Sequence, residues 1–415
     1  MKTTTITKIS TRDLRFALEP GDGTDSVHTN PVYSYAVTLL HTDTGLTGTG
    51  LVFTIGAGNQ QICQLIEALA EPLQGRDIEE MMAGFGQLFK SIADHPQFRW
   101  LGPHKGIVHL ALASITNACF DLWAKARGVP LWRLLLDLSP EQVVDTLDLS
   151  YLEDVLTRGE ALAMLTAHQA SRAERECVIE RGYPGYDTSI GWFHYPDEQV
   201  RENVKRAVQR GFSAMKLKVG SPDTGRDVRR AFLVREAAGD AATVMLDANQ
   251  NWSLPKAIRV CLQLADMNPY WIEEPTHPDD VLAHQTLARA IAPIKVAAGE
   301  HISHRVLFKN FMQAGALSLV QADVTRVGGI SEFITVSMLA RKFGLPVVPH
   351  VGDMGQIHQH MVLFNHIALG HELLFLEHIP HLSQHFAQQA VVKNGVYQTP
   401  QAPGSSSDFI ELQES

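Results

Sequence analysis

The chain has 415 residues, of which 45% are hydrophobic and 19% charged, and its formal net charge is −10 at pH 7. This length exceeds that of one ordinary domain, and the composition is typical of a globular protein with a large core. The negative charge argues against nonspecific nucleic-acid binding, which requires a basic surface.

Apolar runs and cysteines exclude further classes of protein. No segment contains the 18 or more consecutive apolar residues of a transmembrane helix, and residues 1–8 lack the apolar core of a signal peptide. The four cysteines are far apart and form no Cys-x-x-Cys pair. We therefore expect a cytoplasmic protein without a membrane partner, whose cysteines are buried thiols rather than disulfide or zinc-binding residues.

Residues 1–140 have the pattern of a separate α+β domain. Residues 6–16 and 33–40 alternate apolar and polar side chains as half-buried strands do, and a turn leads to a third strand at 48–53. Apolar residues at three- and four-residue spacing predict helices at 59–73, 78–92 and 106–127. An aromatic and basic loop before the last helix contains Trp100, which either packs in the core or covers a substrate.

A second domain is predicted at residues 141–385, with its first strand at 144–151. The long stretch that follows, residues 153–200, contains a turn-rich aromatic segment at 182–192. Because long loops in compact enzymes often cover active sites, this segment is a candidate lid. The tail, residues 386–415, is expected to pack back on the N-terminal domain.

Short apolar runs in the second domain carry charge only at their C-terminal ends. The ionisable residues at these ends are 23 to 29 positions apart, and they are Lys218, Asp247, Glu273, Glu300, Asp323 and His350. One βα unit needs about thirty residues, and successive right-handed units close into a barrel whose catalytic groups stand at the C-terminal strand ends. The sequence therefore predicts an α/β fold, a (β/α)8-type (TIM-like) barrel with an N-terminal α+β capping domain.

Asp247, Glu273 and Glu300 end three successive predicted strands. Acidic residues after strands often only cap the next helix, but three at unit spacing favour a shared ligand. An all-oxygen set of this kind suits a hard cation such as Mg²⁺, which leaves positions open for a bound acid. These three carboxylates are the candidate metal ligands.

Lys216 and Lys218 alternate along one strand, so their side chains point the same way. Lysines can also protect an exposed edge strand from aggregation, but a closed barrel has no edge. We expect both lysines near the metal, where neighbouring positive charge disfavours the ammonium form. One of them can then act as a base near neutral pH.

His350 and Asp323 end two neighbouring predicted strands. A lone histidine at a strand end is more often structural than catalytic. An aspartate bonded to one ring nitrogen, however, fixes the tautomer and orients the other nitrogen toward a substrate. A base, a second acid or base and a metal together suit proton abstraction beside a carboxylate, followed by β-elimination of a leaving group.

At these residues the sequence resembles the enolase superfamily, in the mandelate racemase subgroup, and most closely the L-fuconate dehydratases. The Lys-x-Lys motif, the three metal ligands and the His-Asp dyad all match that pattern. Further similar segments are Leu51–Gly56, Arg99–Pro103, Thr188–Trp192 and Trp271–Thr276.

The resemblance implies a Mg²⁺-dependent hydro-lyase that converts L-fuconate to 2-keto-3-deoxy-L-fuconate. It implies Lys218 as the base for the C2 proton and His350 on the opposite face. It also implies substrate contacts by Lys216, Asn249, Glu377 and Trp100, and a homo-oligomeric assembly.

Two alternatives remain open. One is a dehydratase or epimerase for another aldonate, such as rhamnonate, galactonate or arabinonate. Another is a catalytically silent barrel that serves as a binding protein, although every expected acid, base and ligand is present. The histidine-dense stretch 358–385 contains no His-Glu-x-x-His motif, and we assign no metal to it. Asp353 is a departure from the family pattern that could alter recognition of sugar hydroxyls.

Overall fold

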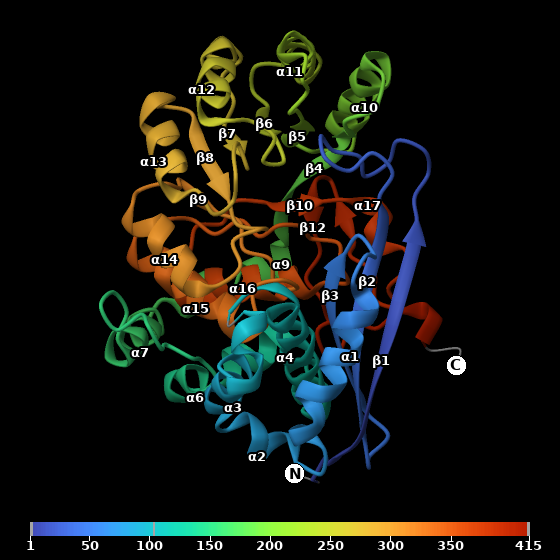
Figure 1. Ribbon diagram of the computed structural model, residues 1–415, viewed down its shortest axis with the longest axis vertical. Coiled ribbons are helices and arrows are strands. Elements are labelled where there is room, and N and C mark those ends of the chain that lie inside the picture. The colour runs from blue at the N-terminus through green and yellow to red at the C-terminus, as the bar shows by residue number, and fades with distance from the viewer. Residues whose placement is uncertain (1–2, 103, 413–415) are drawn as a thin grey trace.

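The computed structural model describes residues 3–102 and 104–412, so Pro103 of the aromatic loop and the last three residues of the tail lie outside it. An N-terminal α+β domain lies beside a barrel domain (Figure 1). Its antiparallel sheet has the order β1-β2-β3, with β1 (Ile6–Ala17), β2 (Val32–Thr42) and β3 (Thr47–Thr54). The three predicted strands are confirmed.

The helices of the N-terminal domain match the predicted apolar patterns, with one interruption at Gly84. They are α1 (Asn59–Ala70), η1 (Glu71–Leu73), α2 (Ile78–Met82), α3 (Phe85–Ala93), η2 (Pro96–Leu101), α4 (Gly106–Ala126) and α5 (Leu131–Asp137). The central helix α4 packs on β3, and a Cβ at Gly50 of β3 would clash with the carbonyl oxygen of Ser114. Glycine is therefore required for this close approach.

The apolar length of α4 follows from its position in the core. By length and composition alone this 21-residue helix could cross a membrane, but 89% of its most apolar window is buried inside the protein. One polar group within it is satisfied by the sheet, since Ser114 donates to the carbonyl oxygens of Ala36 and Gly50.

Parallel strands form the wall of the barrel, and the last strand pairs with the first. The strands are β4 (Tyr183–Gly191), β5 (Ala214–Lys218), β6 (Thr243–Asp247), β7 (Trp271–Glu273), β8 (Lys295–Ala298), β9 (Leu319–Val320) and β10 (Leu376–His378). A parallel bridge between Val320 and Val347 supplies the remaining strand position, between β9 and β10. Side chains that fill the barrel include Tyr186, Met245, Trp271 and Val348.

Helices on the outside connect successive strands of the barrel (Figure 1). They are α10 (Asp197–Gln209), α11 (Thr224–Ala238), α12 (Leu254–Gln263), η3 (Ala265–Met267), α13 (Val281–Ala290), α14 (Arg305–Gln313), α15 (Ile330–Lys342) and α16 (Ile357–Leu369). After β10, the described chain forms only the four-residue α17 (Pro380–Ser383) where an eighth barrel helix would follow. The predicted α/β barrel is confirmed, with seven rather than eight long connecting helices in the described residues.

The predicted first strand at 144–151 is wrong. Ser139 and Gln142 form a reciprocal capping box that starts α6 (Pro140–Asp145), and a helical connection leads on to the barrel. This connection contains α7 (Arg158–Ala167), α8 (Arg172–Arg175) and α9 (Val178–Arg181).

The segment at 182–192 is the first barrel strand, β4, and not a lid. It pairs in parallel with β5 and β10, so its tyrosine and glycine residues lie in the barrel wall. Gly191 has no room for a side chain beside Leu217 of β5. Strand pairing therefore overrides the turn-forming tendency of this composition.

The tail contacts both domains. It forms β11 (Val392–Lys393), β12 (Val396–Tyr397) and η4 (Ile410–Leu412), and β12 pairs antiparallel with β4. Further along, the Ser405 amide donates to Asp121 of α4 at 2.7 Å, and Phe409 packs against Tyr35 of β2.

Candidate active site

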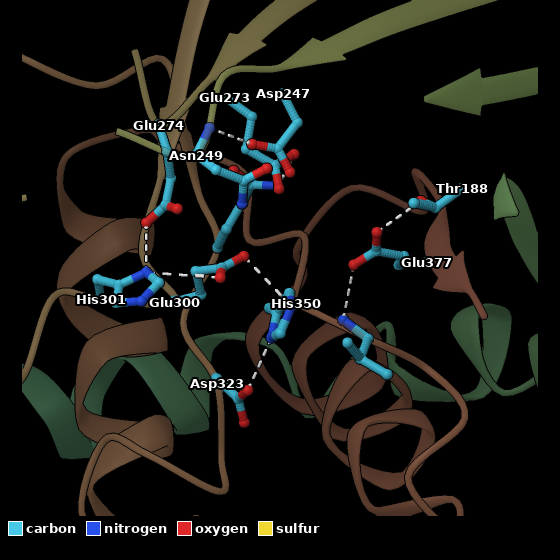
Figure 2. Close-up of polar contacts among 12 residues, drawn as sticks. Thr188, Asp247, Asn249, Glu273, Glu274, Glu300, His301, Asp323, His350 and Glu377 are labelled. Atoms are coloured by element: carbon cyan, nitrogen blue, oxygen red, sulfur yellow. Dashed lines mark hydrogen bonds and ion pairs between the residues drawn. The ribbon is translucent and has the colours of Figure 1, made fainter. Parts of the chain in front are cut away.

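The C-terminal ends of the barrel strands bring the predicted ionisable residues together (Figure 2). Asp247 ends β6, Glu273 ends β7 and Glu300 follows β8. One carboxylate oxygen from each residue lies within 4.8 Å of the other two, and all three side chains are buried. The predicted metal ligands therefore form one cluster.

The electrostatics of this cluster favour a bound cation. Burial raises the pKa of Glu273 to about 8 although Lys216 lowers it, and repulsion from Asp247 adds to the increase. One oxygen of Glu300 is buried without a hydrogen-bond partner in the described chain. Three crowded oxygen donors with such a deficit of positive charge fit a hard divalent cation such as Mg²⁺.

Neighbouring residues hold the carboxylates in place. Gln321 Nε2 donates to Glu273 Oε2 at 2.8 Å, and Trp271 Nε1 donates to the same oxygen at 3.0 Å. The Asn249 amide donates to Asp247 Oδ1 at 2.9 Å. The sequence analysis did not single out Gln321. Gln321 precedes Asp323 by two positions, as Lys216 precedes Lys218, and residues at this spacing on a strand point to the same face. That spacing could have identified it.

A second acidic residue and a histidine flank the cluster, and neither was predicted. His301 Nδ1 donates to Glu274 Oε1 at 2.8 Å and lies 3.5 Å from Glu300 Oε1 (Figure 2). Glu274 has a left-handed backbone, with φ of 43°, which is uncommon for a residue with a side chain. Glu274 directly follows Glu273, and His301 directly follows Glu300. This adjacency to candidate metal ligands could have identified both residues.

The two lysines differ in their access to substrate. Lys218 Nζ donates to Asp247 Oδ2 at 2.6 Å, and its side chain lines a cavity. Lys216 is fully buried and bonds to Glu273 at 2.5 Å and to Glu377 at 2.8 Å. Lys216 therefore holds two carboxylates together, and direct contact between Lys216 and a substrate stays a prediction.

Among the side chains alone, the ammonium form of Lys218 is favoured. Burial has the largest single effect and favours a neutral amine, but the carboxylates of Asp247, Asp25 and Glu300 together outweigh burial and repulsion by Lys216, and the pKa of Lys218 is raised. The predicted destabilisation of the ammonium form includes a bound cation, so it stays a prediction.

His350 lies between two acidic side chains (Figure 2). Its Nδ1 donates to Asp323 Oδ2 at 2.8 Å, and its Nε2 lies 3.2 Å from Glu300 Oε2. Burial opposes protonation, but Glu300 and Asp323 together raise the pKa of His350 to about 9. His358, which was not predicted, lies on the other side of Asp323, with its Nε2 3.2 Å from Oδ1.

The Glu377 carboxylate of β10 is held by hydrogen bonds and an ion pair from three other segments of the chain. Thr188 Oγ1 donates to its Oε1 at 2.5 Å, Lys216 bonds the same oxygen, and the Val351 amide donates to Oε2 at 3.0 Å. Val351 has φ of 59°, a strained conformation for a β-branched residue that aims its amide at Glu377.

The cavity at this site has a volume of about 90 Å³ and lies between the two domains. Lys218, Asn249, His350 and Glu377 line it from the barrel. The N-terminal domain contributes residues that were not singled out as contacts, namely Asp25, His28, Tyr33 and Phe53. Asp25 Oδ1 accepts hydrogen bonds from the amides of Val27 and His28, so this loop folds around the carboxylate.

Trp100 and Asp353 lie away from this cavity. Trp100 is 99% exposed on η2, which contradicts core packing, and it is not among the residues that line the cavity. Asp353 is fully buried and accepts from the Ile379 amide at 2.6 Å and from Tyr397 Oη at 2.8 Å. These partners turn the carboxylate toward β12, so Asp353 does not line the cavity, and its effect on recognition of sugar hydroxyls stays a prediction.

Most of the histidine-dense stretch is buried packing. His358 and His360 are fully buried in α16, and His371 and His378 are each 5% exposed. The Trp132 amide donates to His360 Nδ1 at 3.1 Å, which joins α16 to α5.

Comparisons with known families match both domains. A model described as "Enolase C-terminal domain-like" matches residues 199–411. A model described as "Mandelate racemase / muconate lactonizing enzyme, N-terminal domain" matches residues 16–135.

Individual relatives extend the match over the whole chain. An L-galactonate dehydratase from Hypocrea jecorina is 38% identical over 99% of this chain and 93% of its own length. The crystal structure of human mitochondrial enolase superfamily member 1 superposes with a TM-score of 0.95 at 38% identity, over 99% of this chain and 95% of that one.

A further structure has ligands bound. L-talarate/galactarate dehydratase from Salmonella typhimurium LT2, liganded with Mg and L-lyxarohydroxamate, has a TM-score of 0.78 at 26% identity. This match covers all of the present chain and 93% of the other.

Proposed function

Because this chain belongs to the enolase superfamily, in its mandelate racemase subgroup, we propose that it is a Mg²⁺-dependent acid-sugar dehydratase, a hydro-lyase. The observation that carries the proposal is that Lys218 and His350, on strands that are not neighbours, line one cavity beside three carboxylates. Relatives named as L-galactonate and L-talarate/galactarate dehydratases support this reaction class.

Asp247, Glu273 and Glu300 would hold the cation. When bound there, Mg²⁺ supplies positive charge that polarises the substrate carboxylate and offsets the negative charge that otherwise keeps Lys218 an ammonium.

The residues of this chain then divide the proton transfers. Neutral Lys218 accepts the proton from C2, beside the carboxylate. Protonated His350, held by Asp323, donates a proton to the 3-hydroxyl, and that oxygen leaves as water. The enol that remains tautomerises to the 2-keto-3-deoxy acid when C3 takes up a proton. Glu377, fixed by Thr188 and the Val351 amide, would hydrogen-bond the substrate.

We propose L-fuconate as the substrate and L-galactonate as the second candidate. The two acids have the same configuration at C2 to C5, and L-fuconate has a methyl group where L-galactonate has a hydroxymethyl group. Ile379 and Leu382 give part of the cavity an apolar wall. Such a wall favours the methyl group of L-fuconate over the hydroxymethyl group of L-galactonate. The L-galactonate dehydratase relative supports the alternative.

The test is a screen of Mg²⁺-loaded protein against aldonic and aldaric acids, with the 2-keto product trapped by semicarbazide. We expect turnover of L-fuconate to exceed that of L-galactonate, and Lys218→Ala to reduce kcat/KM roughly hundred- to ten-thousand-fold. Preference for another acid would reject L-fuconate and keep the reaction class. Absence of keto product and of C2 proton exchange with every acid would reject the dehydratase and leave a binding protein.

A further inference from the structure

A second cavity adjoins the catalytic one. Its volume is about 410 Å³, within the rough range of 300–1,000 Å³ typical of small-molecule sites. The two cavities share Phe53, Glu300, His301 and Arg326 as lining residues. Nothing in the proposed reaction uses the second cavity, whose other walls come from the start of α4 and the segment between β3 and α1.

The N-terminus of α4 faces this cavity without a cap. Lys105, the N-cap residue, makes no side-chain capping bond, and Lys105, Gly106 and Ile107 line the cavity. Within the described chain, the amides of Ile107 and Val108 donate no hydrogen bond. The start of this 21-residue helix carries the positive end of its dipole, and these two amides have no acceptor among the described residues.

His109, in the first turn of α4, gives an independent indication of a ligand. Its side chain lines the cavity and is 1% exposed, and its Nδ1 has no partner among the described residues. Its Nε2 lies 2.7 Å from Glu332 Oε2. Buried polar atoms rarely lack a partner, so Nδ1, which has none among the described residues, indicates a group beyond them.

The charges around the cavity favour an anion. Although burial opposes ionisation, His109 and Arg305 lower the pKa of Glu332 to about 2, and this carboxylate lies on the far side of the His109 ring from Nδ1, 2.7 Å from Nε2. Lys105 is exposed, and in the described residues no acidic side chain pairs with it. The Lys105 ammonium therefore adds a positively charged donor at the helix start.

Glu300 is the acidic residue in the wall of this cavity, and three basic side chains surround it. His350 Nε2, His301 Nδ1 and Arg326 Nη1 lie 3.2, 3.5 and 3.6 Å from its carboxylate oxygens. Arg326 also donates to the Glu300 carbonyl oxygen and lies over the Phe53 ring, which keeps a guanidinium between the two cavities.

We propose that this second cavity binds a small oxyanion, a phosphate or carboxylate group, at the N-terminus of α4. The amides of Ile107 and Val108, His109 Nδ1 and the Lys105 ammonium would donate to it. The shared wall allows two sources of that chemistry. One is a free inorganic anion, and the other is the distal carboxylate of a dicarboxylic acid whose first carboxylate occupies the catalytic cavity.

The test measures sulfate binding by calorimetry to the full Mg²⁺-loaded chain, at constant ionic strength. Ile107→Asp places a carboxylate at the helix start, where an acidic residue stabilises the helix and repels an anion. We expect it to weaken sulfate binding at least about tenfold. Ile107→Asn, the matched neutral control, should change affinity less than about twofold, and Lys105→Gln should weaken it about threefold.

The outcomes separate clearly, and catalytic turnover is not needed for any of them. Saturable binding that Ile107→Asp removes and Ile107→Asn retains would establish the site. No saturable binding, or equal affinity in all variants, would overturn it. If galactarate displaces sulfate and galactonate does not, the anion belongs to a dicarboxylic substrate. If neither competes, the site takes a free anion.

Discussion

His350 is the residue whose surroundings separate the two proposed proton transfers. It is bonded to Asp323 and lies on a different strand from Lys218, so removing the imidazole leaves the proposed base in place. This arrangement allows the two steps to be tested one at a time.

We predict that His350→Asn abolishes dehydration but not proton exchange. Keto-acid formation should fall roughly hundred- to ten-thousand-fold, because no acid protonates the leaving hydroxyl. In D₂O, Lys218 should still exchange the C2 proton of the substrate, which proton NMR detects as loss of the C2 signal. Lys218→Ala is the matched control, which should lose both activities. Loss of exchange in His350→Asn would assign C2 proton abstraction to the histidine instead.

At the scale of elements, α16 and α5 are joined by a buried neutral histidine. His360 is fully buried, its Nδ1 accepts from the Trp132 amide, and burial lowers its pKa to about 3 from an ordinary value of 6.5. Below pH 6.5 the unfolded chain binds a proton here that the folded chain does not. The free energy of unfolding therefore falls as the pH decreases from 6.5 toward 3.

We predict that His360→Gln makes stability less sensitive to acid. Urea titrations at pH 7.5 and pH 5 give the free energy of unfolding at each pH. The difference between these two free energies should shrink by up to about 1.4 kcal/mol per pH unit below 6.5. The exposed His277 provides a control, since His277→Gln should leave this difference unchanged. An unchanged difference in His360→Gln would show that this ring does not titrate on unfolding.

At the scale of the whole molecule, the carboxylate cluster couples metal binding to folding. Asp247, Glu273 and Glu300 come from three different strands, so their repulsion acts on the assembled barrel and not on the unfolded chain. A cation bound only to the folded state stabilises it by about 2.7 kcal/mol at 100 times its Kd.

We predict that Mg²⁺ raises the Tm of the chelated protein and that Glu273→Gln largely removes this increase. The substituted amide side chain would keep the shape of the carboxylate but contribute no negative charge. A thermal melt with EDTA and with increasing Mg²⁺ measures the effect, and K⁺ at equal ionic strength is the control. The same Tm with and without Mg²⁺ would reject binding at this cluster.

The fold was predictable from the sequence because ionisable residues mark the ends of successive strands at regular spacing. The period of the strand-end residues predicted the parallel barrel, because each βα unit has a fixed minimum length and ends at the same rim. Lys218, Asp247, Glu273, Glu300, and His350 with its partner Asp323, follow from that periodicity alone. The resemblance supported the same residues.

Sequence reasoning failed where tertiary contacts outweigh local preference. Residues 182–192 have turn-forming composition, yet pairing with β5 and β10 makes them a strand. Asp353 follows a strand like the metal ligands, but Ile379 and Tyr397, the second of which is 44 positions away, hold it apart from the cavity. Such contacts leave no periodic signal in the sequence.

The sequence by itself therefore determined the barrel, the set of ionisable residues that meet at its rim, and the type of metal they suit. These depend on spacing along the chain and on side-chain chemistry. The tertiary structure decided which lysine reaches the cavity, the charge states within the site, and the uncapped start of α4 beside it. These depend on burial and on distances between residues far apart in the chain, and only the folded molecule sets them.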